Sequence, residues 1–337
     1  RKSTTLGGMF NDNHKMHYDG TNIIIANKGA DNVLKLDVST NSVSTVIAAS
    51  TTYLNDVIDV TEDGTYYYTL ARTSGTYSFT SKICKWLISD TTATPSCNTS
   101  SARYATSLTY HADQLFVLQT SSSSSYRKVI IIDTDDMGAA GSFAYSSGVA
   151  SYYYAQGIDA DATTGDLYIA YRDYYGRIRQ YERSDSGTYS ASSYNQVYTY
   201  ARYHGHLTVA DDFVYSTGYY YSSYYGGVKK TATDTLSVST LWSSYSGANG
   251  YKGSLSVTTD GDIYVASNYI YNYYDIKSET TEGLSIVDHL EIQNAVQPWV
   301  DSAVSKTINV GDDVCFDEFK IIYSEAWRTK LKGVTTF

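Results

Sequence analysis

A short unit that recurs along the chain constrains the fold more than any other feature. Each copy consists of an apolar stretch, a turn that carries an aspartate, and a strand rich in Tyr, Ile and Val. Successive aspartates are 44 to 53 residues apart, a repeat length typical of architectures in which one small sheet forms per repeat. These aspartates are Asp19, Asp63, Asp113, Asp166, Asp212, Asp262 and, in a weaker copy, Asp312.

Each copy is expected to form four short strands. In the first copy, strands are predicted over 22–27, 33–38 and 43–48, with turn residues between them. The chain contains only 2 Pro, so little interrupts the strand ladders. Dividing its 337 residues by a mean spacing of about 49 predicts an all-β fold, a β-propeller of seven four-stranded blades.

The last repeat is less regular than the others. No fourth strand follows 334–337, and the N-terminal segment 3–10 is expected to supply it, closing the ring of a single domain over 1–337. Six blades with a C-terminal extension from about Asn294 is the alternative, because 324–329 is compatible with a helix. A Greek-key sandwich fits less well, since it would not produce evenly spaced units.

The first repeat also carries a family resemblance. Its strands Ile23-Ile24-Ile25-Ala26-Asn27, Val33-Leu34-Lys35-Leu36-Asp37 and Val43-Ser44-Thr45-Val46-Ile47 resemble the repeat of YVTN-type propellers, relatives of NHL blades. Many members of those families are surface-layer or secreted proteins. The resemblance therefore implies a cell-surface or secreted scaffold without catalytic residues of its own.

Composition excludes several classes of protein. A hydrophobic content of 42% is enough to fill a core, which argues against disorder. The net charge of −10 argues against binding to nucleic acid. No apolar run approaches the roughly 20 residues of a membrane helix, so membrane insertion is not expected. No motif for a phosphate or a redox cofactor is present, and we predict no cofactor.

The 37 tyrosines are the most unusual part of the composition. In propeller topology, the connections between second and third strands and those between blades lie on one face. Many tyrosines fall in these connections, which predicts a Tyr-rich binding face, because tyrosine offers a large rigid contact area with a hydroxyl group. The predicted binding residues are Tyr153, Tyr154, Tyr174, Tyr175, Tyr220, Tyr221, Tyr224, Tyr225, Tyr271, Tyr273 and Tyr274.

Cysteine and histidine pairs supply two further hypotheses. Folding a hairpin about Asp90-Thr91 places Cys84 opposite Cys97, close enough for a disulfide, and such a bond favours an oxidising compartment. His204 and His206 share one face of a predicted strand and are the residues to consider for a metal. Without a third ligand in the sequence, no metal site is predicted.

These observations predict a non-enzymatic extracellular or cell-surface propeller from a secreted, processed chain. It would bind glycan, a protein or copies of itself through the Tyr-rich face, as an adhesin or as a component of a filament or surface array. The alternative is a polysaccharide-active lyase or hydrolase at the mouth of the propeller channel, with Asp173, Arg202, His204 and His206 as its first residues to test.

Overall fold

The computed structural model divides the chain into two compact units, 1–275 and 276–337. It describes residues 2–3, 15–72, 80–98, 103–121, 125, 127–145, 154–172, 175–200, 205–220, 225–243, 254–266, 270–273, 293, 297, 307–308, 320, 323–324, 326–329, 331–332 and 335–336. A single domain over 1–337 was expected from the repeat. The structure instead separates the last 62 residues from the repeating part.

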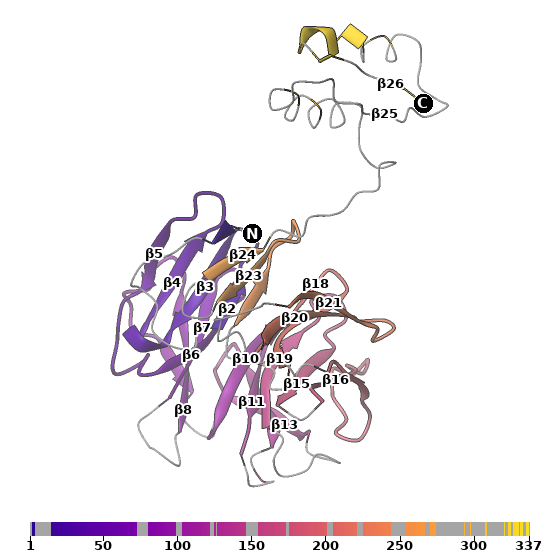
Figure 1. Cartoon of the computed structure of the whole chain (residues 1–337). Coiled ribbons are helices and arrows are strands. Elements are labelled where there is room, and N and C mark those ends of the chain that lie inside the picture. Colours follow the sequence, from indigo (N-terminus) through magenta and orange to yellow (C-terminus); the bar gives the residue numbers. More distant parts are fainter. Residues whose placement is uncertain are drawn as a thin grey trace. The chain divides into compact units, whose positions relative to one another are not determined.

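Within the described residues, the first unit consists of six four-stranded antiparallel sheets (Figure 1). Five of them use four consecutive strands each. They are β2–β5 (Lys15–Tyr18, Asn22–Asn27, Asn32–Asp37, Val43–Ile47), β6–β9 (Val57–Glu62, Tyr66–Arg72, Ser81–Leu87, Ser96–Asn98), β10–β13 (Ala105–His111, Gln114–Gln119, Lys128–Asp133, Ala139–Ala144), β14–β17 (Tyr154–Ala160, Leu167–Arg172, Arg177–Tyr181, Asn195–Tyr198) and β18–β21 (Leu207–Ala210, Phe213–Tyr220, Tyr225–Ala232, Val238–Ser243).

The sixth sheet joins the two ends of this unit. Strands β22 (Leu255–Val257), β23 (Ile263–Ala266) and β24 (Ile270–Tyr273) continue the repeat, and β1 (Lys2–Ser3) pairs antiparallel with β24. In this pairing Lys2 lies opposite Asn272 and Ser3 opposite Tyr271. The strand predicted over 3–10 lies largely outside the described residues.

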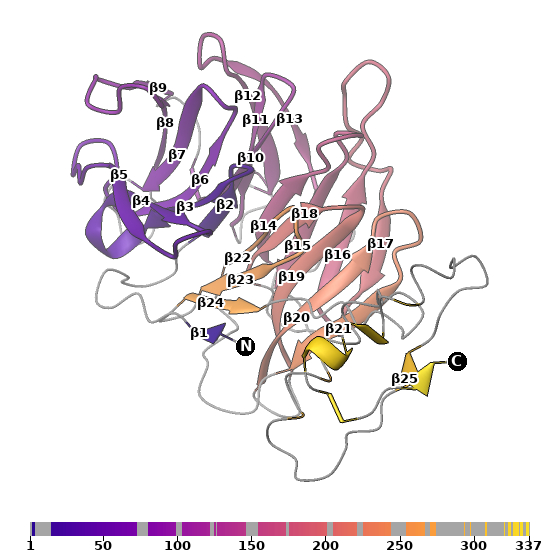
Figure 2. The same ribbon diagram turned by 90° about the horizontal axis from the view of Figure 1, so that it is seen from above.

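The six sheets close into a ring. Each inner strand contacts the next, in the order β2, β6, β10, β14, β18, β22 and back to β2, and Figure 2 shows these strands nearest the common centre. Six clusters of buried apolar side chains accompany this order, each formed by residues of two neighbouring sheets. The cluster between the sixth sheet and the first packs Tyr264 of β23 against Met16 and Ile23. The fold is a β-propeller.

The recurring aspartates are explained by the turns that follow the inner strands. The Asp19 carboxylate accepts hydrogen bonds from the backbone N–H groups of Thr21 and Asn22 at 2.8 and 2.6 Å. Asp63 does the same for Thr65 and Tyr66 at 2.8 and 2.7 Å. An aspartate that caps its own turn in this way fixes the start of the next strand.

The prediction of seven blades is wrong. It divided the whole length by the repeat, whereas residues 276–337 form a unit of a different kind. There β25 (Thr307–Ile308) and β26 (Thr335–Thr336) pair in parallel, and residues between them are helical. The six-blade alternative agrees with the six described sheets, but its extension was placed from Asn294 rather than Ile276.

Candidate functional site

Polar side chains from several inner strands meet inside the propeller, around Lys15 of β2. The Lys15 ammonium donates to the Asp59 carboxylate of β6 at 3.4 Å and to the backbone carbonyl of Gln156 in β14 at 3.2 Å. A further hydrogen bond reaches the Thr106 carbonyl of β10. One lysine therefore connects three other blades. Burial lowers the pKa of Lys15, although the neighbouring Asp59 opposes the shift.

Two aspartates, Asp59, which is buried, and Asp159, which is partly buried, link adjacent blades in the same manner. Asp59 accepts hydrogen bonds from the Ser107 hydroxyl and the Leu108 N–H group, both at 2.8 Å. Asp159, on β14, accepts from the Val209 N–H group at 2.8 Å and from the Thr208 hydroxyl at 3.1 Å. Burial raises the pKa of Asp159 above its usual range.

His206 completes this polar centre. Its Nδ1 lies 3.3 Å from the Ser254 hydroxyl, which also accepts a hydrogen bond from the Met16 N–H group at 2.8 Å. Burial, reinforced by the positive charge of Lys15, lowers the pKa of His206 to about 3. The imidazole is therefore neutral at physiological pH.

The geometry of this cluster favours a structural role. The three protons of the Lys15 ammonium are matched by three acceptors, and both aspartates bind backbone N–H groups, so the charges serve to join blades. Within the described residues, no three His, Cys, Asp or Glu side chains are grouped to hold a metal ion. Asp173, Arg202 and His204, which the channel hypothesis also invokes, lie outside the described residues.

A second candidate is an exposed group of tyrosines beside β16 and β17. The rings of Tyr175 and Tyr198 meet edge to face at 5.9 Å, and those of Tyr175 and Tyr200 at 6.4 Å. The Arg177 guanidinium lies 5.3 Å from the centre of the Tyr198 ring. These rings stay open to solvent, with 52%, 40% and 67% of Tyr175, Tyr198 and Tyr200 exposed. We call these three residues the tyrosine rim.

Of the predicted binding tyrosines, Tyr175 belongs to the tyrosine rim. Five others lie in strands rather than in loops, because tyrosine favours extended backbone and lengthens the hairpins. They are Tyr154 of β14, Tyr220 of β19, Tyr225 of β20, and Tyr271 and Tyr273 of β24. The remaining predicted residues, Tyr153, Tyr174, Tyr221, Tyr224 and Tyr274, lie outside the described residues.

The predicted disulfide is present. Cys84 of β8 lies opposite Cys97 of β9, and their Sγ atoms are bonded. The flanking pairs, Ile83 with Asn98 and Lys85 with Ser96, keep the register that the sequence predicted. A disulfide is consistent with an oxidising compartment, and the extracellular location itself stays a prediction.

Sequence reasoning missed the residues that the structure brings together most closely. Lys15 meets partners 44, 91 and 141 residues away, and no local pattern carries such distances. Trp86 of β8 and Tyr53, from the connection between β5 and β6, also meet, with their rings edge to face at 5.8 Å. The inter-blade contacts of Lys15 become visible once the ring order is known.

The second unit is described at fewer positions. Residues 320, 323–324 and 326–328 are helical and lie between the parallel strands β25 and β26. A parallel pair joined through a helix is the elementary unit of α/β barrels and of doubly wound sheets. Trp327 of this helical segment is 87% exposed. No helix within the described residues is long and apolar enough to cross a membrane.

Comparison with protein families gives a match to the C-terminal part. The model described as "Ribonucleotide reductase, barrel domain" matches residues 220–337. This segment contains the whole second unit, together with β20–β24 of the propeller. The match is to a family other than the YVTN and NHL repeats, so the resemblance noted in the first repeat stays a prediction.

Curated relatives agree with the family match over short stretches. A vitamin B12-dependent ribonucleoside-diphosphate reductase from Mycobacterium tuberculosis is 45% identical over 49 residues, which is 14% of this chain and 7% of the reductase. A vitamin B12-dependent ribonucleotide reductase from Streptomyces avermitilis is 23% identical over 83 residues, or 24% and 9% of the two chains. The matches thus span less than a tenth of these relatives.

Solved structures resemble the chain in its fold. Hydrazine synthase from Kuenenia stuttgartiensis superposes with a TM-score of 0.54 and 12% identity, covering 78% of this chain and 77% of that one. A chain of the mitotic checkpoint complex has a TM-score of 0.51 and 11% identity, covering 81% and 91%. A putative oxidoreductase (glucose dehydrogenase) from Thermus thermophilus has a TM-score of 0.51 and 11% identity, covering 79% and 93%. At such identities the likeness concerns the fold alone.

The comparisons correct one prediction about activity. A non-enzymatic protein was expected because propeller repeats specify a scaffold. The match to a reductase barrel and the identity to vitamin B12-dependent reductases point to an enzyme instead. The physical reason for the error is that the expectation rested on the repeat, which ends before residue 276.

Proposed function

We propose that residues 276–337 are a segment of a ribonucleotide reductase barrel and that the protein containing them reduces ribonucleotides. The observation that carries this proposal is the parallel pairing of β25 with β26 across a helical segment, inside the stretch matched by the barrel family. Antiparallel propeller repeats have no place for such a unit, whereas barrels are built from it.

The exposed Trp327 supports the same proposal. An indole that is 87% in water is unusual, because large aromatic side chains gain free energy from burial. In a complete barrel, a helix packs its apolar side chains against neighbouring helices and strands. We infer that further barrel segments cover Trp327 in the assembled enzyme.

The relatives are named as vitamin B12-dependent, which raises the question of the cofactor. The described residues of 276–337 include no His, Cys, Asp or Glu, the side chains that most often ligate a metal. We derive no step through a cobalt-centred cofactor. The role assigned to this unit is to complete the barrel.

Complementation tests this proposal. The full chain would be mixed with the Mycobacterium tuberculosis reductase from which the matching 49 residues have been deleted, and formation of deoxyribonucleoside diphosphate would be measured with cobalamin coenzyme and a dithiol. We expect turnover to be restored. The Ile308→Pro variant is the matched control, because proline removes a ladder hydrogen bond in β25. Equal turnover with and without the chain would refute the proposal.

A second role concerns the propeller, which we infer to be a binding module that uses the tyrosine rim. Exposed Tyr rings beside an Arg resemble the side chains that dominate interface energies. Glycan, a protein and a second copy are the partner classes it would serve. A photo-crosslinking amino acid at position 200 should capture a partner in native material, and one at the exposed position 87 should not. Equal capture at both positions would contradict the role of the rim.

A further inference from the structure

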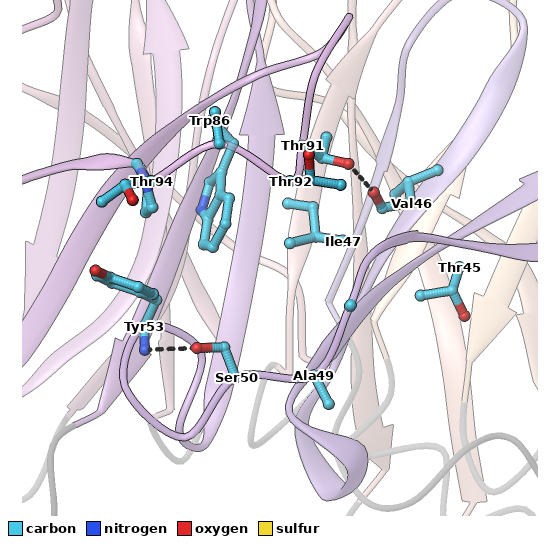
Figure 3. A pocket seen from close by; sticks show the side chains of 13 residues that line it. Thr45, Val46, Ile47, Ala49, Ser50, Tyr53, Trp86, Thr91, Thr92 and Thr94 are labelled. Carbon is cyan, nitrogen blue, oxygen red and sulfur yellow. Dashed lines mark hydrogen bonds between the residues drawn. The ribbon is translucent and has the colours of Figure 1, made fainter.

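A pocket lies between the first two blades (Figure 3), and its described lining includes no residue of the tyrosine rim or of the polar centre. Its volume is about 650 Å³, within the roughly 300–1,000 Å³ typical of small-molecule sites. One wall is the outer strand β5 with the connection that follows it, and the other is the turn between β8 and β9. The Thr91 hydroxyl donates to the Val46 carbonyl at 2.6 Å and joins the two walls.

Two aromatic rings line this pocket. Trp86 and Tyr53 meet edge to face, with ring centres 5.8 Å apart and planes at 88°, and Figure 3 shows both among the lining side chains. Each ring also has a polar partner. The Trp86 indole N–H donates to the Thr69 hydroxyl at 3.0 Å, and the Lys82 ammonium lies 5.3 Å from the centre of the Tyr53 ring. The rings therefore need little reorganisation to accept a ligand.

Hydroxyl groups supply the rest of the polar lining. The Ser50 hydroxyl accepts from the Tyr53 N–H group at 3.2 Å and keeps its own proton to donate. The Thr92 hydroxyl donates to Asp90 at 2.6 Å and keeps lone pairs to accept. Thr45 and Thr94 also line the pocket. No charged side chain belongs to the described lining.

The walls are held at a set distance. The disulfide Cys84–Cys97 closes the hairpin whose turn forms one wall, and the two cysteines are 13 positions apart in the sequence. Cys97 packs against the same apolar cluster as Tyr53, and that cluster contains Trp86. A cross-linked hairpin whose Trp86 side chain belongs to the apolar cluster makes a preorganised frame.

We propose that this pocket binds a neutral saccharide. A pyranose ring presents a C–H face that packs on aromatic rings and a rim of hydroxyl groups that exchange hydrogen bonds with serine and threonine. The absence of charge among the described lining residues disfavours uronic acids and amines, whose charge would be desolvated without a partner. The proposal concerns residues 45–95 and is independent of the reductase role of 276–337.

Calorimetric titration of the full chain tests the site. The probes are the neutral trisaccharides maltotriose, cellotriose and triacetylchitotriose, with trigalacturonic acid as the charged comparison. We expect at least one neutral probe to bind in the millimolar range or better, and the charged one not to bind. Ala93→Trp, at an exposed lining position, should weaken binding by at least about tenfold, or roughly 1.4 kcal/mol.

The matched control is Ala140→Trp, which places the same side chain at an exposed position of β13 in another blade. It should bind like the parent chain, and both variants should keep the parent melting temperature. Failure of all three neutral probes would overturn the proposal. So would stronger binding of the charged probe, or equal binding by the two variants.

Discussion

The two units of this chain are built on opposite principles. In the described part of residues 1–275 every sheet is antiparallel, and within a blade consecutive strands pair with each other, so most ladder hydrogen bonds join residues close in sequence. In 276–337 the described strand pair is parallel, and its partners, Thr307 and Thr335, lie on either side of a helical segment. The comparisons differ as well, since solved structures resemble the chain in fold, whereas the reductase barrel family matches residues 220–337, including the whole second unit.

The difference shows what a repeat can and cannot reveal about function. A repeat specifies inter-blade packing, which many unrelated proteins share at about 12% identity. The non-repeating segment is short, yet it lies wholly within the stretch that the reductase barrel family matches. Activity in such a chain is therefore to be sought outside the regular part, and binding within it.

The largest expected effect comes from breaking the polar centre of the propeller. Asp59→Ala removes the carboxylate partner of the Lys15 ammonium and the acceptor of the Ser107 hydroxyl and the Leu108 N–H group. A buried charge left without its partner costs about 3–5 kcal/mol of unfolding free energy. Urea denaturation followed by circular dichroism measures this loss. Asp59→Asn, which keeps an acceptor oxygen, should lose less, and equal losses would argue against the charge as the cause.

The disulfide is expected to contribute somewhat less. Cys97→Ser opens a loop whose closure stabilises a protein by about 3 kcal/mol when it spans some 15 residues, close to the separation of 13 here. The thermal midpoint of the variant reports the change. Protein isolated from its native source and unfolded without a reductant should show one reactive thiol, that of Cys315. Three reactive thiols would show that the protein resides in a reducing compartment.

Acid should destabilise the propeller through His206. Its pKa is lowered from 6.5 to about 3 in the fold, so the unfolded chain binds one more proton between these values. The contribution of His206 to the free energy of unfolding is fully present above pH 6.5. It falls by roughly 1.4 kcal/mol per pH unit as the pH decreases toward 3. In His206→Asn, which retains a polar atom near Ser254, this slope should disappear from urea midpoints measured across the window. An unchanged slope would assign the acid sensitivity to other groups.

The smallest effect is expected in the C-terminal unit. Trp327→Ala should change the unfolding free energy by less than about 0.5 kcal/mol, because the indole is 87% exposed. Trp86→Ala is the matched comparison, with an indole 5% exposed, and should cost about 3–5 kcal/mol. If assembly with the truncated reductase covers Trp327, its fluorescence should shift to shorter wavelength in the mixture. Similar losses in the two variants would show that Trp327 is buried in solution.

Much of the propeller could be predicted from sequence, because its information is local. The strands expected over 22–27, 33–38 and 43–48 are close to β3, β4 and β5. Folding a hairpin about the turn at Asp90-Thr91 correctly predicted the register of Cys84 with Cys97. The strand residues Tyr67, Tyr68, Tyr168 and Tyr264 are buried between sheets, and Tyr66 is partly buried against one of the clusters. Period-two patterns and turn residues specify such features directly.

The candidate sites were less predictable for a physical reason. Lys15 is one polar residue at the start of a short strand, and its role appears only when β6, β10 and β14 surround it. The pocket proposed to bind a saccharide is formed by residues of two blades, which the sequence does not show to be adjacent. β25 and β26 have two residues each, too few for any periodicity to show, and their parallel pairing depends on the path of the chain between them.

The pairing of β1 with β24 has a consequence for how such a chain is assembled. Lys2 and Ser3 lie beside Tyr271 and Asn272, so the chain enters and leaves the propeller at neighbouring points. A ring with adjacent entrance and exit can be attached to a host protein, or placed within one of its loops, without forcing the flanking host segments apart. The pairing of β1 with β24, which completes the last blade, thus also allows the whole ring to be inserted into different host proteins.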